Sequence, residues 1–344
     1  MTTSSSVSPT QAVLHVIAGF WLSRCVYIAA KLGLADLLDD GPKTPAELAG
    51  ATGTHAPALY RVLRALASTG WLIEDAEGRF AATPLTAGLK TGAPGSLRAL
   101  ATSELGEEHY PAWGNLLFSV KTGELAFDDV FSMPNWKYWA GHEEHAGIFN
   151  RGMSEMTAII EPAVLSLCDL SNARTIVDVG GGRGTLMSSM LTAYPQARGI
   201  VLDLPHVIEQ GRQVIAGNGL QDRCELIAGD FFQSVPSGGD VYTLKWVIHD
   251  WNDAQAVAIL KNCRAAMPPH ARLLLIEAPL SPRNEPSLHK LMDINMLVMT
   301  GGRERTEAEY RSLLDAAGFE LTRVSVTPLE LAVLEAAPRF RTPE

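Results

Sequence analysis

The sequence predicts an α/β protein in which an open, mostly parallel sheet is covered by helices on both faces and is preceded by a mainly helical winged-helix domain. Three observations predict this fold. From residue 174 onward, short apolar runs alternate with helical segments, and the first run leads into a glycine-rich turn. Residues 44–90 show the different rhythm of two short helices followed by two short strands. With 344 residues, the chain is long enough for two domains.

The first helix is predicted in the apolar stretch 12–38. Its apolar residues recur at helical spacing and are interrupted by Arg24 and Lys31, which predicts a long, mostly buried helix. A helix this apolar is equally suited to packing against a second subunit. The run 12–22 is too short to cross a bilayer, and no basic segment precedes it, so we expect no membrane span, no export and a cytoplasmic location.

A winged helix is predicted next, and its usual function is DNA binding with the second helix in the major groove. However, residues 1–100 carry eight Lys or Arg against seven Asp or Glu, and the wing presents Glu74, Asp75 and Glu77. Because phosphates attract a basic surface, we expect a role in dimerisation and in covering a pocket, and no nucleic-acid partner. The expected elements are helices at 45–49 and 57–68 and strands at 71–73 and 79–82.

Charge and cysteine content exclude further partner classes. With 28 Lys plus Arg against 38 Asp plus Glu, the chain would be repelled by nucleic acids and anionic lipids, so a neutral small molecule is the better partner. The four cysteines lie far apart, without a C-x-x-C pair or a partnering histidine cluster. This spacing predicts reduced thiols and neither a disulfide framework nor a zinc site, and we expect no metal.

The segment 95–160 is predicted to be helical and is rich in aromatic residues and methionine. Most of these side chains are expected to form a core at a domain junction. Met153 and Met156 are candidates for contact with a planar ligand, because a flexible thioether adapts to such a surface and pockets tend to form between domains. The predicted organisation is a winged-helix domain over 1–100, a helical region contributing to the substrate pocket over 101–165, and an α/β domain over 166–344.

The α/β domain is predicted to contain five buried parallel strands and an antiparallel edge. Its apolar runs are too continuous for strands with one face in water, which is typical of a parallel sheet. Helices are expected near 288–299 and 306–317, after which 319–327 and 329–335 pair antiparallel. The five runs are 175–177, 199–202, 225–228, 241–244 and 273–276.

Glycines occur where the first strand turns into a helix, and there they let the backbone approach a ligand closely. Gly180, Gly182 and Gly184 form a G-x-G-x-G pattern. A dinucleotide fingerprint would need glycine at Thr185, so the spacing disfavours pyrophosphate recognition.

Acidic residues follow the second and third strands. Asp203 comes about twenty residues after the glycines, where a carboxylate can accept both hydrogen bonds of a ribose diol. Asp230 and Phe231 end the third strand and offer an acceptor for an exocyclic amine beside a ring that can cover a purine. The carboxyl ends of parallel strands share one edge of the sheet, so these residues together predict a nucleoside site there, although each carboxylate alone could be a loop cap.

Five motifs in register resemble the caffeate and isoflavone type of O-methyltransferase and its bacterial relatives, and the similarity covers nearly the whole chain. The resemblance implies a Rossmann-like class I methyltransferase domain with catalytic function over 166–344, a winged helix that serves dimerisation, a homodimer, and S-adenosylmethionine as cofactor. It implies cofactor binding around Gly180, Gly182, Asp203, Leu204, Asp230, Phe231 and Lys245. The motifs are VDVGGGRG at 177–184, DLPH at 203–206, GDFF at 229–232, LKWVIHDW at 244–251 and GGRERT at 301–306.

His249 is the candidate general base, because it follows the fourth strand on the edge that carries the cofactor motifs. A phenol has a pKa of about 10, and a neutral imidazole, with a pKa of about 6.5, can accept its proton. Glu277 closes the fifth strand and could hold the other N–H of the imidazole, and Glu304 is a second candidate for that role. In the resembling family, the matching histidine is the general base and acidic residues matching Glu277 and Glu304 flank it.

The resemblance implies that the acceptor is a hydroxyl of a small aromatic or polyketide-like molecule of secondary metabolism. Plant members often have an acceptor-contacting asparagine shortly before the Gly-Gly pair, where this chain has Asn295-Met-Leu-Val-Met-Thr300. We therefore expect a more apolar pocket lined by Met296 and Met299. Asp250 is a further candidate for acceptor contact, although it could instead cap the helix that starts near residue 252.

Two alternatives stay open. Some relatives of this family bind S-adenosylmethionine but catalyse hydroxylation or decarboxylation, and these tend to lack the histidine base. The other alternative is a winged-helix transcription regulator that senses S-adenosylmethionine, which the acidic wing disfavours.

Overall fold

A computed structural model describes residues 8–339 of the chain. These residues form two compact units, which divide the chain into 1–110 and 111–344. The predicted division into three parts, with boundaries after residues 100 and 165, stays a prediction.

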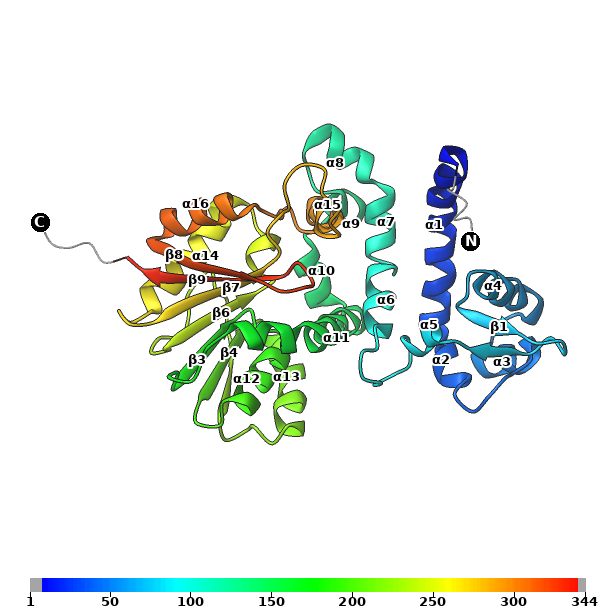
Figure 1. Ribbon diagram of the computed structural model, residues 1–344, viewed down its shortest axis with the longest axis horizontal. Coiled ribbons are helices and arrows are strands. Elements are labelled where there is room, and N and C mark those ends of the chain that lie inside the picture. The colour runs from blue at the N-terminus through cyan, green and yellow to red at the C-terminus, as the bar shows by residue number, and fades with distance from the viewer. Residues whose placement is uncertain (1–7, 340–344) are drawn as a thin grey trace, which may run out of the picture. The chain divides into compact units, whose positions relative to one another are not determined.

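The first unit contains the expected winged helix (Figure 1). Thr44 and Glu47 form a reciprocal capping box that starts the third helix, and Pro45 supplies its first residue. The two strands pair antiparallel, with Leu72 opposite Ala82. The elements are α1 (Pro9–Leu32), α2 (Leu34–Leu37), α3 (Pro45–Thr52), α4 (Ala56–Ser68), β1 (Leu72–Glu74), β2 (Phe80–Ala82), α5 (Pro84–Ala87) and α6 (Arg98–Glu104).

The prediction that the first helix is mostly buried is wrong for the N-terminal half of α1. Val16 is 79% exposed, and apolar neighbours on the same part of the helix are also exposed. By length and composition alone, α1 is long and apolar enough to cross a membrane, whereas the sequence prediction judged a shorter run. This test is weak, because core helices and signal sequences also pass it. The exposed residues are Val13, Leu14, Val16, Ile17, Phe20 and Trp21.

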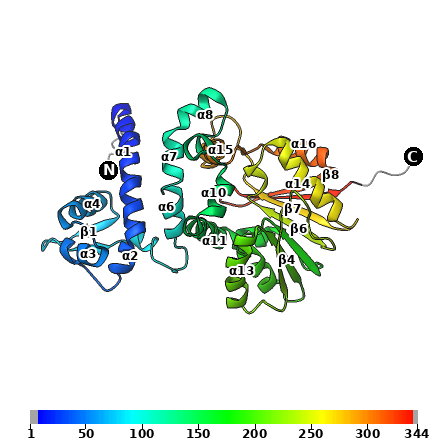
Figure 2. The same ribbon diagram turned by 180° about the vertical axis from the view of Figure 1, so that it is seen from behind.

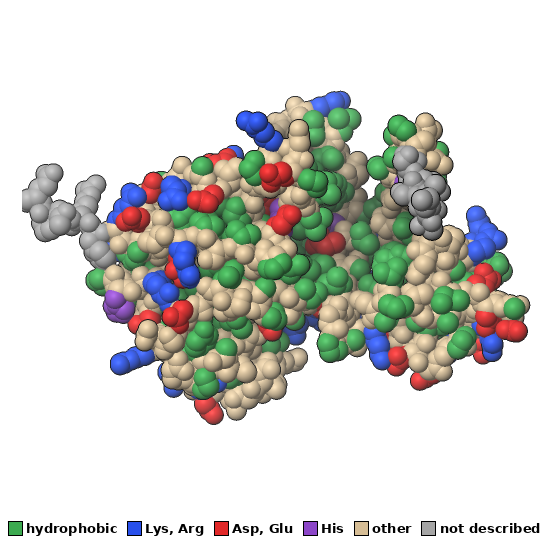
Figure 3. Space-filling view, in the orientation of Figure 1, with side chains coloured by type: hydrophobic (Ala, Val, Ile, Leu, Met, Phe, Trp, Pro, Cys, Tyr) green, Lys and Arg blue, Asp and Glu red, His purple; other side chains and the backbone are tan. Residues whose placement is uncertain are grey.

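The wing of the first unit carries paired charges. Arg79, its basic residue, contacts Asp75 at 2.8 Å and Glu77 at 3.4 Å. Figure 3 shows red and blue side chains mixed on the face of this unit that it displays. The arginine is therefore engaged with carboxylates inside the wing.

The second unit is built on a seven-stranded sheet with the order β5-β4-β3-β6-β7-β9-β8. Strands β3 to β7 are parallel, and β9 and β8 complete one edge antiparallel, as predicted. The predicted fold class is thus confirmed. The strands are β3 (Thr175–Val179), β4 (Arg198–Asp203), β5 (Cys224–Ala228), β6 (Val241–Lys245), β7 (Arg272–Glu277), β8 (Phe319–Val326) and β9 (Ala332–Pro338).

Helices cover both faces of this sheet (Figures 1 and 2). On one face, α14 and α16 pack over strand residues such as Leu275. On the other, α11, α12 and α13 pack over residues such as Ile176 and Ile276. The sheet-covering helices are α11 (Glu143–Leu167), α12 (Thr185–Ala193), α13 (Pro205–Gly217), α14 (Asp253–Ala266) and α16 (Glu307–Ala317).

Shorter helices precede and interrupt this layered arrangement. α15 packs with α9 around an apolar cluster that contains Phe127 and Met299. The unit boundary falls within α7 (His109–Gly114). The other elements are α8 (Leu116–Thr122), α9 (Ala126–Phe131), α10 (Asn135–Gly141), the 3₁₀ helix η1 (Ile248–Asp250) and α15 (His289–Met299).

Candidate active site

The five parallel strands bring the predicted site residues to one edge of the sheet. The glycine turn follows β3, Asp203 ends β4, Lys245 ends β6 and Glu277 ends β7. Register places these ends side by side, because Val179 pairs with Leu202 and Lys245 pairs with Ile276. Residues up to 97 positions apart in sequence, from Gly180 to Glu277, are therefore brought to one edge of the sheet.

Asp203 holds the glycine turn in place. Its carboxylate oxygens accept hydrogen bonds from the backbone N–H groups of Gly182 and Leu204, each at 2.7 Å. Burial raises the pKa of Asp203 to about 6. Since each carboxylate oxygen has two acceptor positions, these contacts leave capacity for the hydroxyls of a ribose.

The glycines leave room at the turn for a ligand. Gly180 and Gly182 have φ of +69° and +60°, a left-handed conformation that glycine adopts without strain. A Cβ on Gly180 would lie 2.8 Å from Val247, whereas a Cβ on Gly182 would meet open space. Gly182 thus leaves space at the turn and Gly180 permits close packing against Val247, while the binding of a nucleoside at these glycines stays a prediction.

Asp178 is a buried carboxylate near the same strand ends that the sequence analysis did not single out. It is buried within β3, where its carboxylate accepts a hydrogen bond of 2.6 Å from the Thr243 hydroxyl. Burial raises the pKa of this carboxyl to about 6, against the opposing effect of the Thr243 hydrogen bond. The sequence signal that could have found Asp178 is a single aspartate within the apolar run of the first parallel strand.

Asp230, Phe231 and Lys245 form the flank of the site beside β5 and β6. Asp230 is exposed and accepts a hydrogen bond from the backbone N–H of Phe232, and the ring of Phe231 packs edge-on against Trp251. Lys245 places its amine 4.2 Å from the ring centroid of Trp246. Burial lowers the pKa of Lys245 to about 8, although nearby carboxylates act in the opposite direction.

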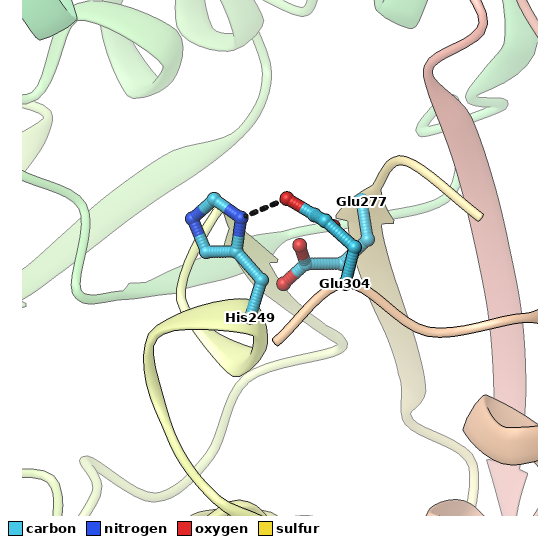
Figure 4. A group of neighbouring side chains, drawn as sticks. All are labelled: His249, Glu277 and Glu304. Carbon is cyan, nitrogen blue, oxygen red and sulfur yellow. Dashed lines mark hydrogen bonds and ion pairs between the residues drawn. The ribbon is translucent and has the colours of Figure 1, made fainter. Parts of the chain in front are cut away.

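His249 is buried and paired with Glu304 (Figure 4). After β6, Trp246 adopts a left-handed φ of +53°, and the chain then enters η1, which carries the histidine. The imidazole Nδ1–H donates to Glu304 Oε1 at 2.8 Å, and Nε2 lies 3.9 Å from a carboxylate oxygen of Asp250. The sequence prediction left the partner open between Glu277 and Glu304, and the geometry favours Glu304.

Burial and nearby charges have opposite effects on the pKa of His249. Burial favours its neutral form, but the negative charges of Glu304, Asp250 and Glu277 outweigh burial and raise the pKa of His249 to about 10. In the free site these carboxylates therefore favour the imidazolium, the direction that the sequence analysis implies for a carboxylate beside His249.

Glu277 supports the turn that carries the histidine. Its Oε1 accepts hydrogen bonds from the backbone N–H groups of Val247 at 3.2 Å and Ile248 at 2.8 Å. Burial raises the pKa of Glu277 to about 7. Glu277 therefore acts on His249 through its charge and through the backbone rather than as the hydrogen-bond partner of Nδ1.

The segment 301–306 lies against the histidine turn. The backbone N–H of Arg303 donates to the carbonyl of His249 at 2.8 Å. A Cβ on Gly302 would lie 1.9 Å from that carbonyl oxygen, so only glycine permits this approach. On the other side, Asp293 of α15 accepts a hydrogen bond of 2.9 Å from the backbone N–H of Glu304.

His249, Glu277 and Glu304 each offer a ligand atom, and the three atoms lie within 4.8 Å of one another, a spacing that could suit a metal ion. A histidine must lose a proton to bind a metal, and the high pKa of His249 opposes this. Its Nδ1 is also already engaged by Glu304. The expectation of a metal-free site stays a prediction.

The candidate acceptor residues lie in α11, α15 and the 3₁₀ helix η1. Met153 and Met156 are half-buried in α11, and Met296 and Met299 are buried in α15. Asp250 is half-buried beside His249, and burial raises its pKa to about 6. The acceptor contacts of these five residues stay predictions.

A cavity of about 710 Å³ lies beside Trp251, and the sequence did not predict it. Trp136 also lines it, and the two indole rings stack with centroids 6.1 Å apart. The loop residues Thr300 and Gly301 contribute to its wall, but none of the four methionines does.

Comparison with known proteins gives concordant results. Residues 113–320 match the model of the O-methyltransferase domain, and residues 14–91 match that of the O-methyltransferase dimerisation domain. The chain is 43% identical over 335 residues to the phenazine O-methyltransferase PhzM of Lysobacter antibioticus, covering 97% of this chain and 98% of that protein. It is 37% identical over 314 residues to the 8-amino-8-demethylriboflavin N,N-dimethyltransferase of Streptomyces davaonensis, covering 90% of each.

Solved structures agree with this assignment. The crystal structure of LaPhzM superposes with a TM-score of 0.94 at 43% identity, covering 96% of this chain and 100% of that one. Human N-acetylserotonin methyltransferase in complex with S-adenosylmethionine superposes with a TM-score of 0.90 at 27% identity, covering 98% and 100%. The chain thus belongs to the O-methyltransferase family and is an S-adenosylmethionine-dependent methyltransferase.

Proposed function

We propose that the protein transfers the methyl group of S-adenosylmethionine to a hydroxyl oxygen of a small aromatic or polyketide-like molecule, with His249 as general base. The observation that carries this proposal is the buried His249–Glu304 hydrogen bond of 2.8 Å, at the sheet edge that also carries the glycine turn. A buried histidine oriented by a carboxylate is an arrangement that serves proton transfer.

The cofactor, when bound, supplies an electrophilic methyl group on a sulfonium with a neutral leaving group. Gly180 and Gly182 would face the nucleoside of the cofactor. Asp203 would accept hydrogen bonds from the ribose, and Asp230 would lie beside the purine ring. Leu204, Phe231 and Lys245 would complete this side of the site. The arrangement fits because the turn has no side chain at the glycines and Asp203 keeps unused acceptor positions.

The protein must position the acceptor oxygen and remove its proton. Glu304 fixes the imidazole through Nδ1, which leaves Nε2 to face the acceptor. The neutral imidazole takes the phenolic proton through Nε2, and the carboxylates of Glu304, Asp250 and Glu277 stabilise the resulting imidazolium. Met153, Met156, Met296 and Met299 are proposed to surround the acceptor, with Asp250 at its polar end.

A nitrogen acceptor is the alternative with a specific observation behind it, since one of the relatives is named as an N,N-dimethyltransferase. A neutral amine reacts through its own lone pair and has less need of a base before transfer. The buried His249–Glu304 pair therefore favours a hydroxyl. The same pair counts against hydroxylation or decarboxylation, and the paired charges of the wing count against a DNA-binding regulator.

We also propose that the protein is a cytoplasmic homodimer of an enzyme of secondary metabolism. The exposed apolar face of α1 lies in the segment that matches the dimerisation domain. A second copy would remove this face from water, which is favourable for contiguous apolar surface.

The first prediction concerns the base. His249→Ala should lower kcat/KM for a phenolic acceptor by about 100-fold or more, because general-base catalysis typically contributes 10²–10⁴-fold. The measurement is transfer of labelled methyl groups to a panel of phenols and anilines, followed by mass spectrometry. His270→Ala, at an exposed histidine, is the matched control and should retain full activity. Equal activity of the two variants would remove His249 from the mechanism.

The second prediction concerns pH. Because only the neutral imidazole accepts a proton, kcat/KM should rise with pH through a midpoint near the pKa of His249, about 10, and level off only above it. In Glu304→Gln the carboxylate that favours the imidazolium is lost, so the midpoint should move to lower pH. Measuring two phenols with different pKa values distinguishes the ionisation of the enzyme from the ionisation of the substrate. If the midpoint changes with the pKa of the phenol and is the same in wild type and Glu304→Gln, the assignment of His249 as the base is contradicted.

The third prediction concerns metals. A chelator should leave methyl transfer unchanged, because the base and the cofactor supply the chemistry without a Lewis acid. Activity is measured after dialysis against EDTA and again after addition of Mg²⁺ or Zn²⁺. Loss of activity that either ion restores would instead assign His249, Glu277 and Glu304 to a metal site.

The fourth prediction concerns assembly. Light scattering should give twice the 37.1 kDa mass of the chain. Val16→Asp combined with Ile17→Asp should shift the mass towards the monomer, since charges on the apolar face of α1 cannot be buried without a partner. Ile73→Asp, a charge at another exposed apolar position, is the control. A wild-type monomer would refute the homodimer.

A further inference from the structure

Arg305 is fully buried, and all five of its N–H donors are used. Its Nε and Nη2 donate to the same carboxylate oxygen of Asp253, at 3.0 and 2.9 Å. Nη1 donates to the carbonyl of Ile248 at 3.0 Å and to that of Arg303 at 3.2 Å, and Nη2 also donates to the carbonyl of Trp251 at 2.7 Å. The guanidinium is thus the centre of a fixed set of contacts.

These contacts bracket the proposed base. Ile248 precedes His249, and Trp251 follows it by two residues, so the arginine holds the turn on both sides of the imidazole. The carbonyl of His249 itself is held by the backbone N–H of Arg303. Arg305 is also the direct neighbour of Glu304, the residue whose carboxylate accepts from the imidazole. The Arg305 side chain therefore joins the segment that carries Glu304 to the turn that carries His249.

No other side-chain type reproduces this set. A lysine has three donors around one atom and cannot reach carbonyls on two sides of the turn at once. A buried cation that loses part of its contacts leaves unpaired carbonyls and an uncompensated charge. Because of these five contacts, replacing Arg305 changes the geometry of the histidine turn as well as the local charge.

We propose that Arg305 is the positioning residue of the His249–Glu304 pair, holding the imidazole in the place where the Glu304 carboxylate engages it. The proposal rests on the proposed function in so far as it treats this pair as catalytic. Arg305 touches neither reacting atom in this role and acts through the backbone of the histidine turn.

The test follows the titration of His249 in the full-length protein without cofactor or acceptor. Nuclear magnetic resonance of histidine labelled with ¹³C at the ε1 carbon gives the titration curve, and the spectrum of His249→Ala identifies the signal. Arg305→Lys and Arg305→Gln should both lower the midpoint by about one unit or more, because a displaced imidazole loses its close contact with the carboxylate. Isothermal titration with S-adenosylmethionine should give a Kd unchanged within about threefold.

Arg303→Gln is the matched control. Arg303 is exposed and its side chain also contacts Asp253, at 3.2 Å, but this side chain does not donate to the histidine turn. Removing this charge should leave the His249 midpoint in place. If the Arg303 and Arg305 variants shift the midpoint equally, the effect is not one of positioning and the proposal fails.

The two Arg305 variants separate geometry from charge. If Arg305 acted by charge alone, Arg305→Gln would raise the His249 midpoint, since a nearby cation disfavours the imidazolium, and Arg305→Lys would leave it unchanged. A raised midpoint in Arg305→Gln together with an unchanged one in Arg305→Lys would overturn the proposal. An unchanged His249 midpoint in both Arg305 variants would overturn it too. Weakened cofactor binding in both variants would indicate a general loss of structure at the sheet edge and would also overturn it.

If neither Arg305 variant folds, Asp253→Glu provides the test with a smaller change, because it keeps the negative charge but displaces the carboxylate that anchors two of the five donors. The His249 midpoint should fall in this variant as well. The titration needs no methyl acceptor, so an acceptor panel without activity would count against the proposed function while leaving this result intact. When an acceptor is known, the Arg305→Lys variant should lose kcat with little change in KM.

Discussion

The need to compensate charge inside the protein shapes the whole site. His249, Glu277 and Glu304 are buried together, and a buried charge is costly unless it is paired and hydrogen-bonded. The imidazole is paired with Glu304, while Glu277 accepts from two backbone N–H groups. Arg305 supplies a buried cation beside the same turn. These contacts tie together β6, β7 and the segment 301–306, although the second carboxylate oxygens of Glu277 and Glu304 are buried without a hydrogen-bond partner.

This compensation explains how a sheet edge becomes a reaction site. Parallel strands place Asp203, Lys245 and Glu277 side by side, but they do not orient a base. Orientation comes from the left-handed residue Trp246, which turns the chain after β6 into a 3₁₀ helix, and from the loop that brings Glu304 to the imidazole. In the proposed mechanism, the cofactor and the base are then held by different strand ends of one sheet.

The parallel strands, the antiparallel edge and the glycine turn were predictable because each follows from a local pattern, whereas the order of the strands in the sheet was not predicted. The exposure of α1 was not, since a helix that is apolar on all sides has the same composition in a core and at an interface. The choice of Glu304 over Glu277 depends on how the loop after α15 returns to the histidine, a long-range arrangement. Nor does a pattern reveal that Arg305 turns inward, because its neighbour Arg303 has the same chemistry and stays exposed.

The close approach of Gly302 to the carbonyl of His249 also restricts how this protein can diversify. Any side chain at position 302 would collide with the backbone, whereas Met299 and Met296 lie three and six residues earlier, where they are buried in α15. Substitutions on α15 are constrained as well, because Asp293 accepts from the backbone N–H of Glu304 and Met299 lies in the apolar cluster with Phe127. Packing at Met296 and Met299 can be redesigned by exchanging one apolar residue for another, whereas position 302 admits only glycine, since main-chain atoms fill the space of its Cβ.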